Sequence, residues 1–383
     1  MSTIHWTEAR TARSVPSARS AHWQCESTSP LPARVVVADD RTKAATAYRL
    51  ACEGTALLWR GDYHNARQLL RAMDRRIARK AVPPADDPLK SFRLHRRARH
   101  HRSRVLSRLL VLLDEHHALG LRRAPDVRQA CTEAYGPPHR PTAVPLTELL
   151  GVIGAHQWRL KGVEVPALGG ARIHPHYGVF SPVRGEYVDL VARTPLPAPV
   201  AHGAYSTAFD LGTGTGVLAA VLARRGVGHV TATDINPRAL ACARDNADRL
   251  GLATRIEVTG PTLYPRGRAG LVVCNPPWFP GRPASPLEQG VYDPSSSMLR
   301  GFLDGLADHL EPGGEGWLVL SDLAERLGLR TRHELLTLID SAGLHVHDKV
   351  DTTPRHPRAT DTTDPLHAAR AAEVTSLWRL VPQ

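Results

Sequence analysis

Three glycines and one acidic residue form the clearest ligand-binding pattern in the chain. The segment Ala208-Phe-Asp-Leu-Gly-Thr-Gly-Thr-Gly-Val217 places Gly212, Gly214 and Gly216 where a strand is expected to turn into a helix. Glycine there lets a ligand approach backbone amides near a helix N-terminus. Asp234 ends the next expected strand, roughly twenty residues later, where a carboxylate can bind both ribose hydroxyls of a nucleoside. In the alternative interpretation, the glycines only form a tight turn and Asp234 caps its strand.

The sequence DLGTGTG, residues 210–216, followed by TDINPRAL, residues 233–240, resembles motifs I and II of class I S-adenosylmethionine methyltransferases. The spacing GxGxG suits that cofactor better than the GxGxxG of nicotinamide enzymes. The resemblance implies that the glycines border the methionine part of the cofactor, Asp210 supports the loop and the methionine amine, and Asp234 holds the ribose. The cofactor-binding residues that it implies are Asp210, Gly212, Thr213, Gly214, Gly216, Asp234, Ile235 and Asn275.

The segment after the third expected strand departs from the family pattern. In Val258-Thr-Gly-Pro-Thr-Leu-Tyr264, Pro261 stands where many relatives carry an acidic residue that binds the adenine amine. The adenine contacts are therefore not assigned.

The tetrapeptide Asn275-Pro276-Pro277-Trp278 follows the fourth expected strand and is the predicted catalytic motif. It resembles the [DN]PP[FYW] motif of amino-group N-methyltransferases, which include DNA adenine, rRNA guanine and protein glutamine enzymes. The lone pair of a planar NH2 is delocalised, so catalysis must come from alignment and hydrogen bonds. Asn275 and Pro276 can offer two carbonyl acceptors to such a group, two prolines stiffen the backbone, and Trp278 can stack on a flat target.

A segment upstream of the glycine loop resembles the one that precedes motif I in the same enzymes. It runs His174-Pro-His-Tyr-Gly-Val-Phe-Ser-Pro-Val-Arg-Gly-Glu186. The likeness implies that Phe180, Pro182 and Arg184 line the cofactor or target pocket. A purely structural helix start with a buried Phe180 explains the segment equally well.

Charge and composition narrow the class of partner. The chain of 383 residues carries a formal net charge of +12, with a pI near 9.9. Clustered Lys and Arg favour a polyanion, because binding phosphates releases counterions. The basic stretch Arg93 to Arg104 would suit an RNA backbone, although a solvated helix face is an equal alternative, and arginine also accumulates in high-GC genomes.

Cysteine use and hydropathy favour a cytoplasmic protein. The five cysteines are scattered, with no CxxC pair, which suits a reducing compartment. Residues 1–10 lack the pattern of a secretory signal, and no stretch approaches the ~20 apolar residues that span a bilayer. The alternating pairs His174/His176 and His345/His347 lack further ligands at suitable spacing, so no metal is predicted.

Composition and periodicity divide the chain into three parts. Residues 1–41, rich in Ser, Thr, Ala, Arg and Pro, predict a poorly ordered tail. Residues 42–165 show apolar positions at helical spacing and predict a basic helical domain that selects the substrate. In residues 166–383, seven Val-rich runs alternate with helical patterns. They predict an α/β fold, a Rossmann-like, mostly parallel seven-stranded methyltransferase sheet.

The motifs predict an S-adenosyl-L-methionine-dependent N-methyltransferase that acts on a planar NH2 group. An exocyclic amine of a nucleobase, in RNA, is the favoured target. A glutamine amide in a translation factor or ribosomal protein presents the same planar group to Asn275, so the motif does not distinguish the two. A protein that binds the cofactor without turnover is a third alternative, and the intact NPPW motif argues against it.

Overall fold

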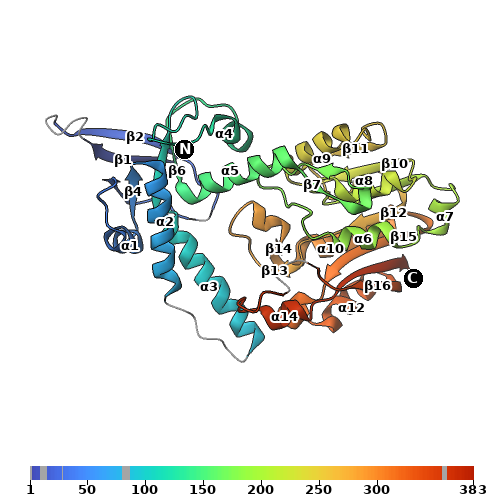
Figure 1. Cartoon of the computed structure of the whole chain (residues 1–383). Helices are drawn as coiled ribbons and strands as arrows, with labels where there is room; N and C mark the ends of the chain where they lie inside the picture. Colours follow the sequence, from blue (N-terminus) through green and yellow to red (C-terminus); the bar gives the residue numbers. More distant parts are fainter. Residues whose placement is uncertain (1, 9–14, 28, 80–86, 356–359) are drawn as a thin grey trace. The chain divides into compact units, whose positions relative to one another are not determined.

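The computed structural model describes the whole chain except residues 1, 9–14, 28, 80–86 and 356–359 (Figure 1). The chain forms two compact units. Unit 1 comprises Met1–Pro84 and Arg93–Gln157, and unit 2 comprises Ala85–Phe92 and Trp158–Gln383. The predicted boundary near residue 165 therefore falls eight residues after the one observed.

Unit 1 is built on a six-stranded sheet with the strand order β1-β2-β6-β5-β4-β3. Neighbours β3, β4 and β5 are parallel, whereas β5 and β6 are antiparallel. All five residues of β4 are buried, as expected for an inner strand covered on both faces. The strands are β1 (Thr3–Glu8), β2 (Ser17–Trp23), β3 (Arg34–Ala38), β4 (Thr55–Trp59), β5 (Leu109–Leu113) and β6 (Thr142–Pro145).

The prediction of a poorly ordered tail over residues 1–41 is wrong for the part that the structure describes. Ile4, Trp6 and Trp23 are buried in one core cluster together with Leu58 and Leu110. Along β1 the buried and exposed side chains alternate, which is the period of a half-buried strand. The composition of the whole segment, dominated by polar residues, concealed these few apolar positions.

The prediction of a purely helical domain over residues 42–165 is also wrong, because unit 1 mixes helices and strands. Leu57 and Leu58 lie in β4 and Leu109 and Leu110 in β5, although all four fall within the range expected to be helical. A short run of consecutive apolar residues fits a buried strand as well as a helix, so periodicity alone misassigned them. The helices are α1 (Ala44–Cys52), α2 (Tyr63–Ala78), α3 (Pro88–Leu106), α4 (Arg128–Tyr135) and α5 (Leu146–Lys161).

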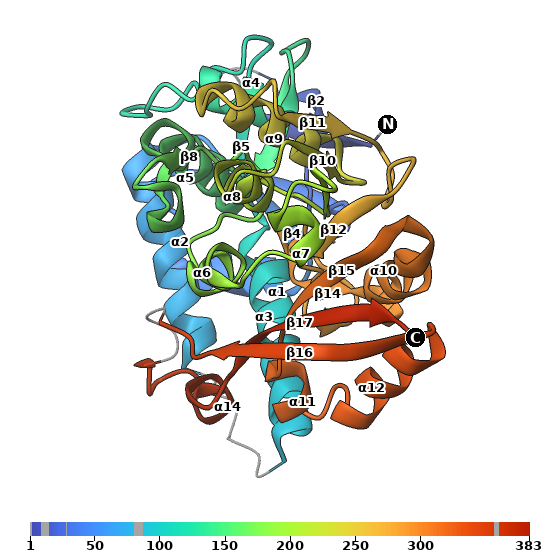
Figure 2. The same cartoon turned by 90° about the vertical axis from the view of Figure 1, so that its right-hand side faces the viewer.

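Unit 2 contains the predicted seven-stranded, mostly parallel sheet. Its strand order is β11-β10-β9-β12-β15-β17-β16, and only β17 runs antiparallel to its neighbours. Figure 2 shows β17 beside β16 at one edge of the sheet. The strands are β9 (Thr207–Leu211), β10 (His229–Thr233), β11 (Ile256–Thr259), β12 (Ala269–Cys274), β15 (Leu310–Ser321), β16 (Leu344–Thr352) and β17 (Thr375–Pro382).

Helices cover both faces of this sheet. In β12, Val273 packs into the cluster that holds Leu218 of α8, while its neighbour Val272 packs into the cluster that holds Phe302 of α10. Successive strand residues therefore serve opposite cores. The helices are α6 (Glu186–Arg193), α7 (Ala198–Ala201), α8 (Val217–Arg224), α9 (Pro237–Arg249), α10 (Ser297–Leu306), α11 (Leu323–Arg326), α12 (Arg332–Ser341) and α14 (His367–Ala371).

Short elements complete unit 2. The two-residue pairs are β7 (Val163–Glu164) with β8 (Arg172–Ile173), and β13 (Phe279–Pro280) with β14 (Tyr292–Asp293). Among the described residues of this unit, the 3-10 helices are η1 (Pro166–Leu168), η2 (Leu287–Gly290), η3 (Pro294–Ser296) and η4 (Ala307–His309). Within the described residues, no helix combines the length and apolar character needed to cross a membrane.

The burial of β1 predicts a measurable contribution to stability. Ile4→Ala should lower the free energy of unfolding by about 2 to 5 kcal/mol, because it removes a side chain that is 2% exposed. His5→Ala, on the exposed side of the same strand, should change it little. Urea denaturation of both variants checks the difference. Equal stability of the two variants and the natural chain would restore the interpretation of residues 1–41 as a tail.

Candidate functional site

The glycine loop connects β9 to α8, as predicted from the sequence. Gly212 and Gly216 have φ angles of +68° and +79°, which L side chains rarely adopt. A Cβ at Gly212 would collide with Met298 Cε, and one at Gly216 would lie 3.2 Å from the Cα of Ala243 in α9. Glycine is therefore required at both positions. Gly212 leaves room for the Met298 side chain over the loop, and Gly216 lets the start of α8 approach α9.

Asp210 holds the loop together from the end of β9. Its side chain is 1% exposed, and its Oδ2 accepts hydrogen bonds from Thr213 Oγ1 at 2.6 Å and from Ala219 N at 2.9 Å. Burial raises the pKa of Asp210 to about 6. The carboxylate thus joins strand, loop and helix in one hydrogen-bonded unit.

Asp234 lies against the glycine loop, directly after β10. Its Oδ2 accepts a hydrogen bond from Gly214 N at 3.0 Å and its Oδ1 one from Asn236 N at 2.8 Å. Burial raises the pKa of Asp234 as well. The backbone of Ile235 also hydrogen-bonds this carboxylate, so about one of its four acceptor positions remains for a ligand. Ile235, the next residue, is 74% exposed.

The segment after β11, which contains Pro261, approaches Asp234 closely at Gly260. Gly260 follows β11 directly, and a Cβ on it would lie 2.6 Å from the backbone oxygen of Asp234. Thr233 Oγ1 donates a hydrogen bond to Leu263 O at 2.5 Å. The segment 260–263 therefore borders the acidic residue, although Pro261 itself is exposed and supplies no acidic group.

The NPPW motif emerges beside the glycine loop. Strand β12 is parallel to β9, with Val273 level with Asp210 and Cys274 level with Leu211. The next residues along the two strands, Asn275 and Gly212, therefore begin loops at the same edge of the sheet. Ligands of open α/β sheets bind at this carboxyl edge.

Trp278 is hydrogen-bonded to Asn275 within the motif. Its indole Nε1 donates to Asn275 Oδ1 at 2.9 Å. The sequence suggested that this carbonyl and the indole would both face the target, but one lone pair of the carbonyl is already engaged. Because an amide oxygen has two lone pairs, one remains for another donor. Pro276 is buried, while Pro277 and Asn275 are half-buried.

Arg184 covers Trp278 and is held by two buried carboxylates. Its guanidinium lies 4.8 Å from the indole centroid. Its Nε donates to Glu186 Oε1 at 2.8 Å, and a terminal nitrogen donates to Glu373 Oε1 at 2.9 Å. Ser321 Oγ also donates to Glu373 Oε1, at 2.6 Å. Of the three residues singled out upstream of the loop, Arg184 is the one that the structure brings to the NPPW motif.

Phe180 and Pro182 lie in the same segment as Arg184 but differ from it in surroundings. Phe180 is 39% exposed, so it is not the buried side chain that the alternative interpretation assumed. A Cβ at Gly290 would lie 2.9 Å from Phe180 Cβ, which places Phe180 next to η2. Pro182 is buried.

The segment after NPPW returns to the glycine loop through α10, which sequence reasoning did not foresee. Asp293, 3% exposed, accepts hydrogen bonds from the backbone nitrogens of Met298 and Leu299, at 3.0 and 3.2 Å. Met298 is thereby fixed at the helix start, with its side chain over Gly212. Glu373 and Met298 are two site residues that were missed, and no local sequence motif marks either.

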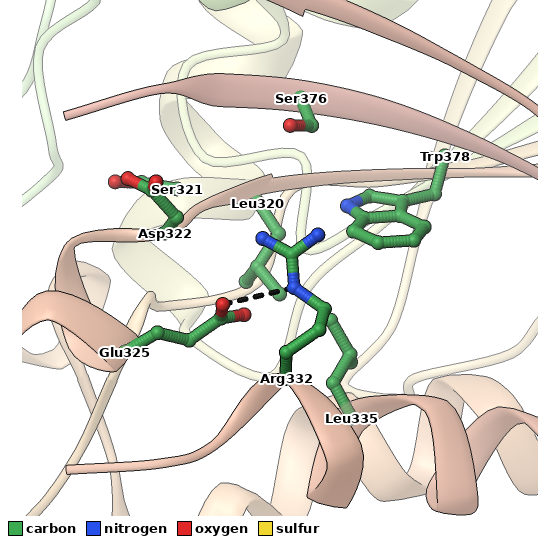
Figure 3. A pocket seen from close by; sticks show the side chains of 8 residues that line it. All are labelled: Leu320, Ser321, Asp322, Glu325, Arg332, Leu335, Ser376 and Trp378. Carbon is green, nitrogen blue, oxygen red and sulfur yellow. Dashed lines mark hydrogen bonds and ion pairs between the residues drawn. The ribbon is translucent and has the colours of Figure 1, made fainter. Parts of the chain in front are cut away.

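A separate hollow lies at the end of β15 and the start of β17 (Figure 3). Arg332 points toward it, with its Nε bonded to Glu325 Oε2 at 2.9 Å. None of the predicted site residues lines this hollow. Its lining residues are Leu320, Ser321, Asp322, Glu325, Arg332, Leu335, Ser376 and Trp378. Among the residues that the structure describes, no three His, Cys, Asp or Glu side chains gather as metal ligands.

Comparison with known proteins agrees with this geometry. Residues 170–330 match the family model of the methyltransferase small domain. The chain is 32% identical over 154 residues to the release factor glutamine methyltransferase of Cereibacter sphaeroides, covering 37% of this chain and 53% of that protein. It is 35% identical over 122 residues to the ribosomal protein L11 methyltransferase of Vibrio cholerae, covering 31% of this chain and 41% of the relative. The chain thus spans about half, or less, of these relatives.

A solved structure gives a more distant likeness. The ribosomal protein L11 methylase of Lactobacillus delbrueckii subsp. bulgaricus is 18% identical, with a TM-score of 0.36 over 56% of this chain and 86% of that one.

The matched residues span the glycine loop, Asp234 and the NPPW motif, the features on which the resemblance was based. Residues 170–330 of this chain therefore match the methyltransferase small domain, as the resemblance of the glycine loop and the NPPW motif implied.

Proposed function

We propose that this chain transfers a methyl group from S-adenosyl-L-methionine to the planar NH2 of a nucleobase in RNA. The observation that carries the proposal is the convergence of the glycine loop and the NPPW motif. Both follow the ends of adjacent parallel strands, where Cys274 is level with Leu211. A cofactor bound at the loop would thereby present its methyl group to a target bound at Asn275.

Residues of the loop and of Asp234 would hold the cofactor. The backbone of Gly212, Gly214 and Gly216 offers a surface without side chains, and Asp234 keeps an acceptor position for a ribose hydroxyl. Met298 lies over Gly212 and would turn aside, which its flexible thioether chain permits. When bound, S-adenosyl-L-methionine supplies an electrophilic methyl group, and the electrons of the broken carbon–sulfur bond stay on sulfur.

Asn275 and Pro276 would orient the target nitrogen. The free lone pair of Asn275 Oδ1 and the backbone carbonyl of Pro276 can accept the two N–H bonds of a planar NH2 group. These two bonds direct the nitrogen lone pair out of the ring plane, toward the methyl carbon. After transfer the nitrogen carries the new methyl group, both of its protons and a positive charge. It then loses one of these protons to water, so alignment rather than a strong base accounts for catalysis.

Trp278 would form the platform for the flat target. Arg184 lies over one face of the indole, and the ring also packs against two core clusters, so a base would stack on the part of the ring that stays exposed. Stacking of a base on an aromatic side chain contributes about 1 to 3 kcal/mol in single-stranded nucleic-acid systems.

The five cysteines form no disulfide, which suits action in the reducing cytoplasm.

A glutamine side-chain amide is the second candidate target. It presents the same planar NH2 to Asn275, and the 32% identity to a release factor glutamine methyltransferase favours it. A cofactor-binding protein without turnover is disfavoured by the intact NPPW motif beside the loop.

Asn275→Ala should lower the rate of methyl transfer by roughly a hundredfold to a thousandfold, because it removes an oriented acceptor. The dissociation constant of S-adenosyl-L-methionine, measured by calorimetry, should stay within about threefold. The rate is measured as tritiated methyl groups entering RNA or protein from cells that lack this chain. Nuclease-sensitive label supports the proposal, whereas label removed only by protease would replace RNA with a protein amide.

Asp234→Asn should act on cofactor binding instead. Losing a charged acceptor costs about 1.5 to 3 kcal/mol, so the dissociation constant of S-adenosyl-L-methionine should rise roughly tenfold to a hundredfold. The rate at saturating cofactor should fall much less. Glu257→Gln, at an exposed position of β11, is the matched control. A dissociation constant unchanged by Asp234→Asn would remove this residue from the binding site.

Arg184→Met should raise the KM for the methyl-accepting RNA several-fold while leaving cofactor affinity unchanged, because Trp278 loses the cation that fixes its ring. Arg184→Lys should recover part of the loss through the retained charge. Glu373→Gln, which weakens the anchor of Arg184, should resemble a mild form of Arg184→Met. A loss of folding stability that accounts for all three results, seen by thermal unfolding, would contradict a positioning role.

A further inference from the structure

The positive charge of the chain is concentrated on two helices of unit 1. Residues 63–79, which are α2 and its C-cap, and residues 93–106 of α3 contain eleven arginines and a single acidic residue, Asp74. Their net charge is therefore +10, against +12 for all 383 residues. The remainder of the chain is close to neutral. An arginine-rich genome would spread this charge, so composition alone does not explain its concentration.

On each helix, three exposed arginines share one face. On α2 and its C-cap, Arg71, Arg75 and Arg79 recur at four-residue steps, which places them on one face about 6 Å apart along the axis. On α3, Arg93, Arg97 and Arg104 recur at steps of four and seven, again on one face. We call these six residues the α2–α3 basic surface.

The single acidic residue of the two helices does not neutralise this surface. Asp74 is engaged by Arg102, whose Nε and a terminal nitrogen donate to the two carboxylate oxygens at 2.6 and 2.7 Å. This two-pronged ion pair joins α2 to α3, which lie side by side in Figure 1. The ion pair therefore occupies the one acidic side chain of residues 63–79 and 93–106 and joins the two helices.

Like charges at four-residue spacing weaken a helix by about 0.2 to 0.5 kcal/mol per pair. A solvated helix face that serves only the fold has no need of them, since alternating Glu and Lys would stabilise it. All six side chains are exposed, so core packing does not require arginine at these positions. Repulsion between these arginines lowers the stability of the isolated protein, whereas a bound polyanion would neutralise their charge.

We propose that the α2–α3 basic surface binds the phosphate backbone of RNA. The choice of RNA among polyanions rests on the proposed function, and the chemistry of the surface agrees with it. All six side chains are arginines, whose planar guanidinium binds phosphate through two parallel hydrogen bonds, as lysine cannot. Contacts to the backbone hold an RNA without reading its sequence, leaving the choice of base to the NPPW site.

The test is direct binding of a fluorescein-labelled, mixed-sequence single-stranded RNA of about 20 nucleotides to the full chain, followed by fluorescence anisotropy. One variant replaces Arg71, Arg75 and Arg79 by Gln, and a second replaces Arg93, Arg97 and Arg104. The matched control replaces the exposed Arg34, Arg41 and Arg266, which removes the same charge elsewhere.

Each surface variant should bind the RNA at least tenfold more weakly, whereas the control should lose less than threefold. Losing three phosphate contacts should also reduce the slope of log K against log salt by about 2. Thermal unfolding of all variants verifies that they fold. Equal loss in the control and the surface variants would overturn the proposal, and so would competition by polyglutamate as effective as competition by unlabelled RNA.

The same measurement separates this proposal from the proposed function. RNA binding requires no cofactor, and Asn275→Ala should bind the RNA like the natural chain. If the transferred methyl group enters protein while the surface variants still lose RNA affinity, RNA is not the methylated substrate. The proposal for the α2–α3 basic surface is then still supported. If both surface variants bind RNA as tightly as the natural chain, the α2–α3 basic surface is not an RNA-binding site, whichever molecule receives the methyl group.

Discussion

The shared edge of the parallel strands is the constraint on which the site depends. Strands β9, β10 and β12 end at one edge, so three loops far apart in sequence meet there without any motif being long. Asp210 then fixes the first loop to its strand and its helix through two hydrogen bonds. Asp234 fixes the second loop to the first through Gly214 N. Sheet geometry brings the loops together, and buried carboxylates hold them there.

Contiguous parts of the site could be predicted from the sequence, because their chemistry is local. The glycine loop, Asp234 and NPPW each occupy a few residues at the end of an apolar run. Glu373 could not be predicted, since its bond to Arg184 joins residues 189 positions apart. Met298 escaped for the same reason, because only the return of α10 brings it over Gly212.

In unit 1 the wrong predictions came from judging whole segments by their average composition and periodicity. Residues 1–41 are polar on average, but a strand needs only a few apolar side chains on one face, and Ile4, Trp6 and Trp23 supply them. The apolar runs of β4 and β5 were long enough to be noticed and too short for their period to separate strand from helix. Unit 2 avoided both difficulties because its inner strands β9, β10 and β12, buried on both faces, stand out between Gly and Pro residues.

The position of β17 has a consequence for how the protein is made. This strand inserts between β15 and β16, although it follows both of them along the chain. While a ribosome is still synthesising residues 375–382, β15 and β16 have no partner between them. Glu373 lies two residues before β17 and reaches Arg184 only at that stage. The nascent chain can therefore form the glycine loop well before Glu373 can anchor Arg184 beside Trp278. The cofactor-binding part of the site can thus form before the target-binding part is complete.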